Sequence, residues 1–123
     1  MIDVVAILNV HRPMLLKAIS RNTEGWTWET MSIAILEGRL GLFHNGDSVA
    51  VMQMCNSPKG QYLHILFGAG KQEALYKLYD VVADWGKANG CYKMTTLGRK
   101  GFIRRLPKMG WKQPFAFFER ALT

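Results

Sequence analysis

The segment 40–54 constrains the fold more than any other, because it has the pattern of two strands joined by a tight turn. Strand-forming residues lie on both sides of Asn45-Gly46, a dipeptide that commonly supplies the two positive-φ residues of a type I′ hairpin turn. A second turn at 56–60 leads into another strand-like run, 61–67. The sequence therefore predicts a meander of three antiparallel strands.

A long amphipathic helix follows this meander. Gly68-Ala-Gly70 is expected to break the strand, and Leu75, Leu78, Val82 and Trp85 then recur on one helical face, up to a stop near Asn89-Gly90. Residues 91–97 read as the next strand. A strand, a helix and a strand in this order predict parallel pairing with a right-handed crossover.

The N-terminal segment predicts a strand and two helices. Val4–Leu8 is a short apolar run rich in β-branched residues, and Pro13–Arg21 has apolar residues at helical spacing. Trp28–Glu37 reads as a second helix, with Thr27 placed to cap its start and Gly38 placed to end it.

The C-terminal segment predicts a short helix and a last strand. Residues 99–108 read as a basic helix shortened by Pro107 and ended by Gly110. Trp111–Ala121 reads as an aromatic strand. The whole chain, residues 1–123, is therefore expected to form one α/β (α+β) domain, with a mixed, mostly antiparallel sheet of about six strands and about four flanking helices.

Composition fits a folded domain with a basic C-terminal third. Hydrophobic residues make up 49% of the chain, and its apolar runs are too short and interrupted for a membrane span or a signal peptide, so we expect a cytoplasmic protein without a membrane partner. Cys55 and Cys91 lack neighbours at zinc-ligand spacing, which favours free thiols. Residues 1–86 carry seven bases and eight acids, whereas residues 87–123 carry nine bases and one acid. That excess attracts phosphate-bearing partners, such as a nucleotide cofactor or a nucleic acid, and acidic protein surfaces.

The order of these elements resembles the GNAT N-acetyltransferase superfamily over nearly the whole chain. Two local features add to the resemblance: Phe67-Gly-Ala-Gly70 between a strand and the long helix, and the closing segment 105–111 with its basic, apolar, Gly and aromatic residues. The resemblance implies acetyl-CoA or another acyl-CoA as cofactor. Its pyrophosphate would bind backbone N–H groups at a helix N-terminus, at the positions of Gly68, Ala69, Gly70 and Lys71.

Several positions depart from the family pattern. Ile65 replaces the Arg or Gln that precedes the first glycine, and Leu106 replaces the Tyr that protonates the departing thiolate in many members. Arg99 replaces an Asn that contacts the cofactor arm. Arg99 and Arg104 belong to a basic cluster that could bind the cofactor phosphates, or simply face solvent. The short chain and the glycine segment look most like small GNAT-like proteins of tailed bacteriophages.

Acyl transfer to an amine needs a general base, and the sequence offers histidines. His64, with Tyr62 on the same face of its strand, is the candidate pair. The alternative is an ordinary, partly buried sheet histidine. His44 reads as a solvated turn residue, and His11 as ordinary.

Three functions stay open at this point. The first is acyl-CoA-dependent N-acetylation of an unknown amine. The second is a catalytically silent, phage-encoded module that binds a protein partner or a phage particle, in the host cytoplasm or in the virion. The third is a nucleic-acid-binding accessory protein that uses the basic C-terminal third.

Overall fold

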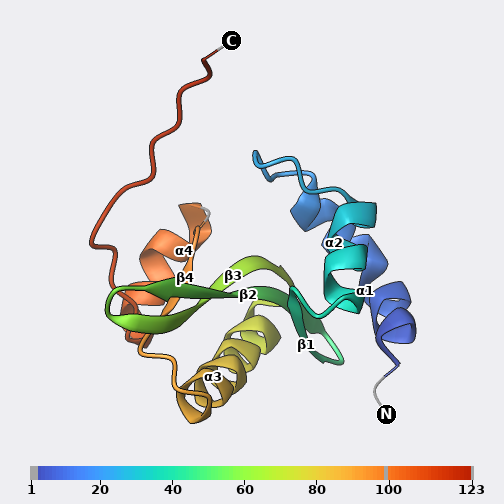
Figure 1. Cartoon of the computed structure of the whole chain (residues 1–123), viewed down its shortest axis with the longest axis horizontal. Coiled ribbons are helices and arrows are strands. Elements are labelled where there is room, and N and C mark those ends of the chain that lie inside the picture. Colours follow the sequence, from blue (N-terminus) through green and yellow to red (C-terminus); the bar gives the residue numbers. More distant parts are fainter. Residues whose placement is uncertain (1–2, 99, 123) are drawn as a thin grey trace.

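A four-stranded sheet with helices on both faces forms the body of the molecule (Figure 1). The computed structural model describes residues 3–98 and 100–122. Within them the order is α1 (Val4–Ile19), α2 (Trp28–Leu36), β1 (Gly41–Asn45), β2 (Ser48–Ser57), β3 (Gly60–Gly70), α3 (Gln72–Ala88), β4 (Met94–Thr96), α4 (Lys100–Arg105) and a 3₁₀ helix (Leu106–Met109). The fold is therefore mixed α+β, as expected, but the sheet of the described residues has four strands instead of about six.

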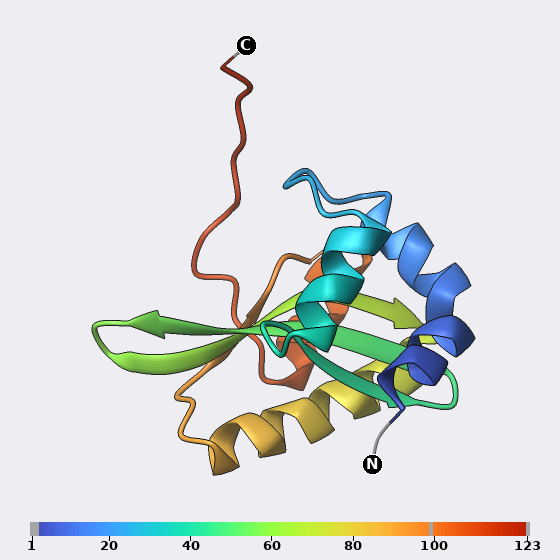
Figure 2. The same cartoon turned by 45° about the vertical axis from the view of Figure 1, so that its right-hand side comes forward.

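The antiparallel meander is confirmed. β1 pairs with β2 and β2 with β3, and the β2–β3 hairpin extends beyond the body of the molecule (Figure 2). The predicted type I′ turn is wrong, because neither Asn45 nor Gly46 has a positive φ. Instead the Asn45 side chain shapes the turn: its Oδ1 accepts hydrogen bonds from the Asp47 N–H and the Ser48 hydroxyl, at 3.1 and 2.7 Å.

The two faces of the sheet carry different helices. Val49 and Val51 pack with α1 and α2, whereas Ala50 packs with α3 and α4. β3 has a bulge, because Met52 pairs with Ile65 but Val51 pairs with Phe67, which leaves one extra residue on β3 between the two pairs. The alternation of its side chains between the two faces of the sheet is therefore reversed after the bulge. The extra residue on β3 sends the side chains on either side of the bulge to opposite faces.

The long helix and the parallel strand after it are also confirmed. α3 buries its apolar face against the sheet, with Leu75, Leu78 and Val82 all at most 3% exposed. β4 pairs in parallel with β3, over Leu63–Ile65. β4 is shorter than the predicted strand 91–97.

The predicted N-terminal strand Val4–Leu8 is wrong, because these residues form the first turns of α1. Asp3 caps the helix by accepting a hydrogen bond from the Ala6 N–H at 3.1 Å. Leu8, Leu15 and Ile19 then fall on one buried helical face, so helical spacing outweighs the β propensity of the first residues. Pro13 lies inside this helix rather than at its start. No helix among the described residues is long and apolar enough to cross a membrane.

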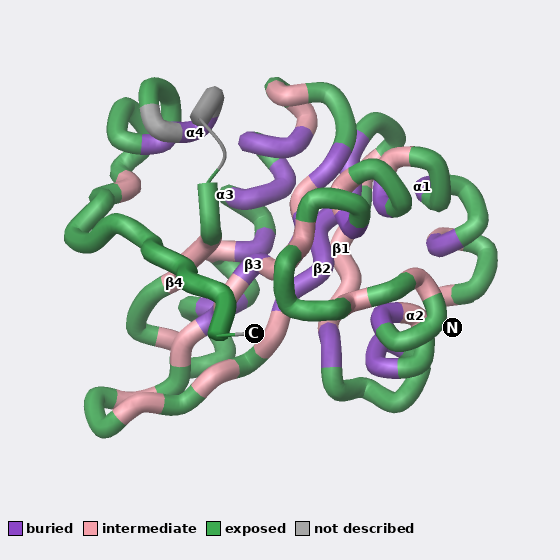
Figure 3. The backbone as a smooth tube through the Cα atoms, turned by 90° about the horizontal axis from the view of Figure 1, so that it is seen from above, coloured by how far each residue is buried: buried purple, intermediate pink, exposed green. Residues whose placement is uncertain are grey.

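The predicted final strand Trp111–Ala121 is also wrong. Trp111 packs against Tyr79 of α3, with ring centroids 6.1 Å apart. The rest of the C-terminal tail, defined as residues 111–122, leaves the body in an extended course (Figure 1) and is exposed (Figure 3). It pairs with no described strand. Phe115 and Phe118 are 85% and 88% exposed. β propensity alone does not make a strand, because a strand needs a partner for its backbone hydrogen bonds.

Candidate functional site

The end of β3, the β1–β2 turn and the start of α3 meet at one junction. The Lys71 N–H donates to the Asp47 carbonyl at 3.0 Å, and the Lys71 Nζ lies 3.7 Å from the Asp47 carboxylate. Gly70 has φ +117, a conformation that L side chains rarely adopt, and a Cβ there would collide with backbone atoms of Asp47 and Ser48. The junction therefore depends on glycine at position 70.

The sequence suggested that Gly68-Ala-Gly70 breaks the strand. In the structure these three residues are instead the last residues of β3. A Cβ on Gly68 would collide with the Tyr79 hydroxyl and would lie 3.4 Å from Leu75. Close packing of β3 on α3 therefore explains Gly68, and the junction explains Gly70. Neither position requires a ligand to account for its glycine.

Free backbone donors lie one turn later, at the start of α3. Lys71 is the N-cap residue and makes no capping hydrogen bond with its side chain. The N–H groups of Gln72, Glu73 and Ala74 have no hydrogen-bond partner within the described part of the chain. These three amides, together with the positive end of the helix dipole, favour an anion.

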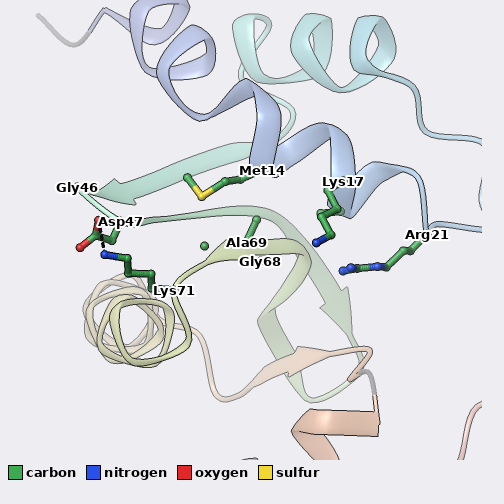
Figure 4. A pocket seen from close by; sticks show the side chains of 10 residues that line it. Met14, Lys17, Arg21, Gly46, Asp47, Gly68, Ala69 and Lys71 are labelled. Atoms are coloured by element: carbon green, nitrogen blue, oxygen red, sulfur yellow. Dashed lines mark ion pairs between the residues drawn. The ribbon is translucent and has the colours of Figure 1, made fainter.

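An open cavity of about 460 Å³ adjoins this helix start, and we call it the α1–β3 cavity. One wall comes from α1 and the turn after it, and the rest from the β1–β2 turn and the junction of β3 with α3 (Figure 4). Its lining residues are Met14, Lys17, Ala18, Arg21, Gly46, Asp47, Gly68, Ala69, Gly70 and Lys71. Three cations and one carboxylate give this lining a net charge of +2.

β3 also has an open edge beside the cavity. β4 pairs with β3 only at Leu63–Ile65, whereas β3 continues to Gly70. On the side that faces β4, residues 66–70 therefore border no strand of the described sheet. This divergence leaves backbone groups of β3 available to an extended ligand.

His64 lies on β3 next to the point where β3 and β4 diverge. Its Nδ1 is 2.8 Å from the Thr95 hydroxyl oxygen, and that hydroxyl donates to the Leu63 carbonyl at 3.4 Å. When the Thr95 hydroxyl donates to Leu63, it accepts from Nδ1–H of His64, and this tautomer leaves the Nε2 lone pair available. Burial lowers the pKa of His64, and the negative charge of Glu24 offsets part of this shift. His64 is therefore neutral at neutral pH and able to accept a proton.

Tyr62 does not form a pair with His64. Its ring packs edge-on against Tyr92, with centroids 6.2 Å apart, and the Lys93 ammonium lies 4.9 Å from its centroid. The Tyr92 hydroxyl is 3.0 Å from the Ser57 hydroxyl, and this bond, helped by Lys93, lowers the pKa of Tyr92. Tyr62 thus belongs to an aromatic and basic cluster on the β2–β3 hairpin.

The other histidines lie near the first helix. His11 is only 2% exposed and packs edge-on against His44 of β1, with centroids 5.5 Å apart. Its Nδ1 is buried and has no hydrogen-bond partner among the described residues. Burial, and then the charge of His44, lower the pKa of His11. The sequence suggested that His11 is an ordinary residue. In the structure it is a core residue whose Nδ1 has no hydrogen-bond partner among the described residues.

The remaining predicted site residues lie apart from the cavity. Arg104 is exposed at the end of α4 and does not line the α1–β3 cavity. Arg99 lies outside the described residues. Leu106, at the position of the family tyrosine, is 7% exposed and packs in the core between the sheet, α3 and α4. His64 also does not line this cavity, although it lies four residues before Gly68 on the same strand.

A second, larger hollow of about 920 Å³ lies between β4, the 3₁₀ helix and the first part of the tail. Cys55 and Cys91 are free and partly buried, as expected. Among the described residues, no group of three or more His, Cys, Asp or Glu side chains could bind a metal ion.

Sequence reasoning missed three polar side chains of this region. Lys17 and Arg21 are four residues apart, which puts them on one face of the predicted helix Pro13–Arg21. In the structure α1 ends at Ile19, and the position of both side chains over β3 depends on tertiary packing. Thr95 was within reach of prediction, since parallel pairing of β3 and β4 sets it opposite His64.

Comparison with solved structures identifies the fold. No protein-family model matches the sequence, and no curated protein does either. An acetyltransferase from Trypanosoma brucei is 17% identical, with 95% of this chain and 94% of that chain covered at a TM-score of 0.65. A predicted acetyltransferase from Clostridium acetobutylicum, solved with acetyl-CoA, is 12% identical, with 98% and 90% covered at 0.66.

A third similar structure is glucosamine-6-phosphate N-acetyltransferase from Arabidopsis thaliana, 11% identical, with 94% of each chain covered at a TM-score of 0.65. These neighbours are acetyltransferases of the GNAT fold. At this level of identity the likeness establishes the fold of the chain, and the expected GNAT-like architecture is confirmed.

Proposed function

We propose that the protein is an acyl-CoA-dependent N-acyltransferase, with acetyl-CoA as the first donor to test and an amine as acceptor. The observation that carries the proposal is that β3 holds both the neutral His64 and, at residues 66–70, an unpaired edge. This edge leads to the start of α3, whose first N–H groups have no side-chain cap. The GNAT fold supports it, since similar structures carry acetyltransferase activity in their names, and one was solved with acetyl-CoA.

The residues present fit such a cofactor at two places. The N–H groups of Gln72, Glu73 and Ala74 would hold the diphosphate, next to Lys71. The unpaired edge of residues 66–70 would hold the amide-containing arm through backbone hydrogen bonds. Gly68, Ala69 and Gly70 then contribute through this edge and through the shape of the junction. Arg99 and Arg104 remain proposed contacts for the rest of the cofactor.

His64 would remove the proton that the amine must lose. When bound, the cofactor supplies an acyl thioester, whose leaving thiol has an ordinary pKa near ~8.5 by analogy with cysteine. Nε2 of His64 would accept the first proton of the ammonium and release it to solvent. The amine nitrogen loses a second proton as its bond to the acyl carbon forms and the C–S bond breaks, and the same imidazole, neutral again, would relay that proton to the departing thiolate. Since Leu106 cannot donate a proton, this relay would replace the usual tyrosine. Tyr62 is the second proposed residue, near the acceptor.

The test is a steady-state assay that detects the thiol released from acetyl-CoA with a panel of amines. For His64→Gln we expect a fall in kcat of about 10²–10⁴-fold, the usual contribution of general acid–base catalysis. The matched control is His44→Gln, which changes an exposed histidine and leaves kcat unchanged. Unchanged kcat in a folded His64→Gln enzyme, or no release of thiol by the wild type with any amine, contradicts the proposal.

A second candidate is a catalytically silent module, encoded by a phage, that binds a protein partner. The exposed apolar side chains of the tail, such as Phe115 and Phe118, favour it, because isolated soluble proteins seldom expose such groups together. It predicts no acyl transfer and a partner that is lost when the tail is removed. A nucleic-acid role through the basic C-terminal third predicts binding whose affinity falls steeply with salt.

A further inference from the structure

We infer that Lys17 of α1 and Arg21, in the turn after this helix, form with Lys71 the side-chain half of a phosphate-binding site in the α1–β3 cavity. If the phosphate belongs to the acyl-CoA cofactor or to a phosphorylated amine, the inference rests on the proposed function. The shared chemistry is a phosphate or diphosphate group. The first argument is position: the charged ends of Lys17 and Arg21 both point toward the strand that carries Gly68 and Ala69 (Figure 4).

The second argument is charge. Arg39 and Lys71 are the described bases with an ion-pair partner in the structure, at Glu37 and Asp47. Lys17 and Arg21 have no carboxylate partner within the described residues, although both line one cavity. Two cations that face one space repel each other, and a bound anion would offset that repulsion.

The third argument is that donors of two kinds lie at this end of β3. Lys17 and Arg21 contribute charged side chains to the cavity lining, and the free N–H groups at the start of α3 follow directly after Lys71, which also lines the cavity. Charge-assisted hydrogen bonds to phosphate are stronger than neutral ones. The Asp47 carboxylate opposes an anion, but its ion pair with Lys71 reduces that effect.

The experiment compares Lys17→Gln, Arg21→Gln and the double variant with Lys77→Gln, an exposed base on α3 outside the cavity. Dissociation constants for coenzyme A and inorganic pyrophosphate are measured by calorimetry at low salt. We expect each single variant to lose up to about tenfold in affinity, the double variant more, and the control none. Asp47→Asn should bind several-fold more tightly, because it removes the opposing charge.

Two further arms identify the source of the phosphate. In the first, KM for acetyl-CoA is compared with KM for a phosphate-free acetyl thioester of cysteamine. In the second, the affinity for glucosamine 6-phosphate is compared with that for glucosamine. A loss confined to the coenzyme assigns the site to the cofactor, and a loss confined to the sugar phosphate assigns it to the acceptor; either result supports the inference.

Other outcomes overturn it. If the double variant lowers the melting temperature of the ligand-free protein but binds every phosphate ligand normally, the two cations serve only the C-terminal end of α1. Wild-type protein that binds none of these ligands also overturns the inference. Pyrophosphate binding that depends on Lys17 and Arg21, without any acyl transfer, retains the site and refutes the proposed function alone.

Discussion

Replacing Gly70 by alanine should destabilise the protein severely, because this glycine joins β2, β3 and α3. At φ +117 a side chain is strained, which costs on the order of 1–3 kcal/mol. The added Cβ would also meet the Asp47 carbonyl and the Ser48 Cα, at less than van der Waals distance. These are backbone atoms in a paired strand and turn, so relief requires a backbone shift, and overpacking of this kind costs about 1–3 kcal/mol.

The sum predicts that Gly70→Ala lowers the free energy of unfolding by about 2–6 kcal/mol. Urea titration followed by tryptophan fluorescence and circular dichroism measures it. Gly46→Ala is the matched control in the adjacent turn, where no atom lies within 4 Å of an added Cβ and φ is not positive. That change should be neutral or stabilising by up to about 1 kcal/mol. A loss below about 1 kcal/mol in Gly70→Ala, or equal losses in both variants, refutes the reasoning.

Two other predictions concern acid and the tail. Burial lowers the pKa of His11, so the unfolded chain binds a proton at this residue more readily than the folded protein does. The free energy of unfolding should therefore be highest above pH ~6.5 and fall as the pH drops below that value. Urea titration between about pH 7.5 and 5 should show a smaller fall in His11→Gln than in the wild type. Phe115→Ser and Phe117→Ser should change the free energy of unfolding by less than about 0.5 kcal/mol, because both side chains face solvent; a larger loss by thermal or urea unfolding would show that the tail packs on the body.

The central part of the fold was predictable because its signals are local. Turn-forming residues bound β2 and β3, and the apolar face of α3 repeats at helical spacing over seventeen residues. The capping role of Thr27 was equally local: its hydroxyl accepts from the Thr30 N–H at 3.2 Å. These features depend on residues within one or two turns of each other, so the sequence displays them directly.

The two ends of the chain were mispredicted because their state depends on distant partners. Val4–Leu8 has the composition of a strand, but Asp3 caps a helix that starts there, and these residues pair with no described strand. The tail has the composition of a strand too, and remains unpaired beside β4. Strand formation is decided by hydrogen bonds to another segment, which composition does not specify.

The glycine segment shows how the same residues can suggest a site for the wrong reason. From the sequence, Gly68 and Gly70 indicated a backbone that approaches an anion. In the structure Gly68 makes room for Tyr79, and Gly70 makes room for the β1–β2 turn. Because those contacts place α3 immediately after Gly70, its first amides emerge beside a cavity lined by Lys17 and Arg21. Packing thus accounts for both glycines. Anion binding must therefore depend on the neighbouring groups, Lys17, Arg21 and Lys71, and substitutions of these residues test it.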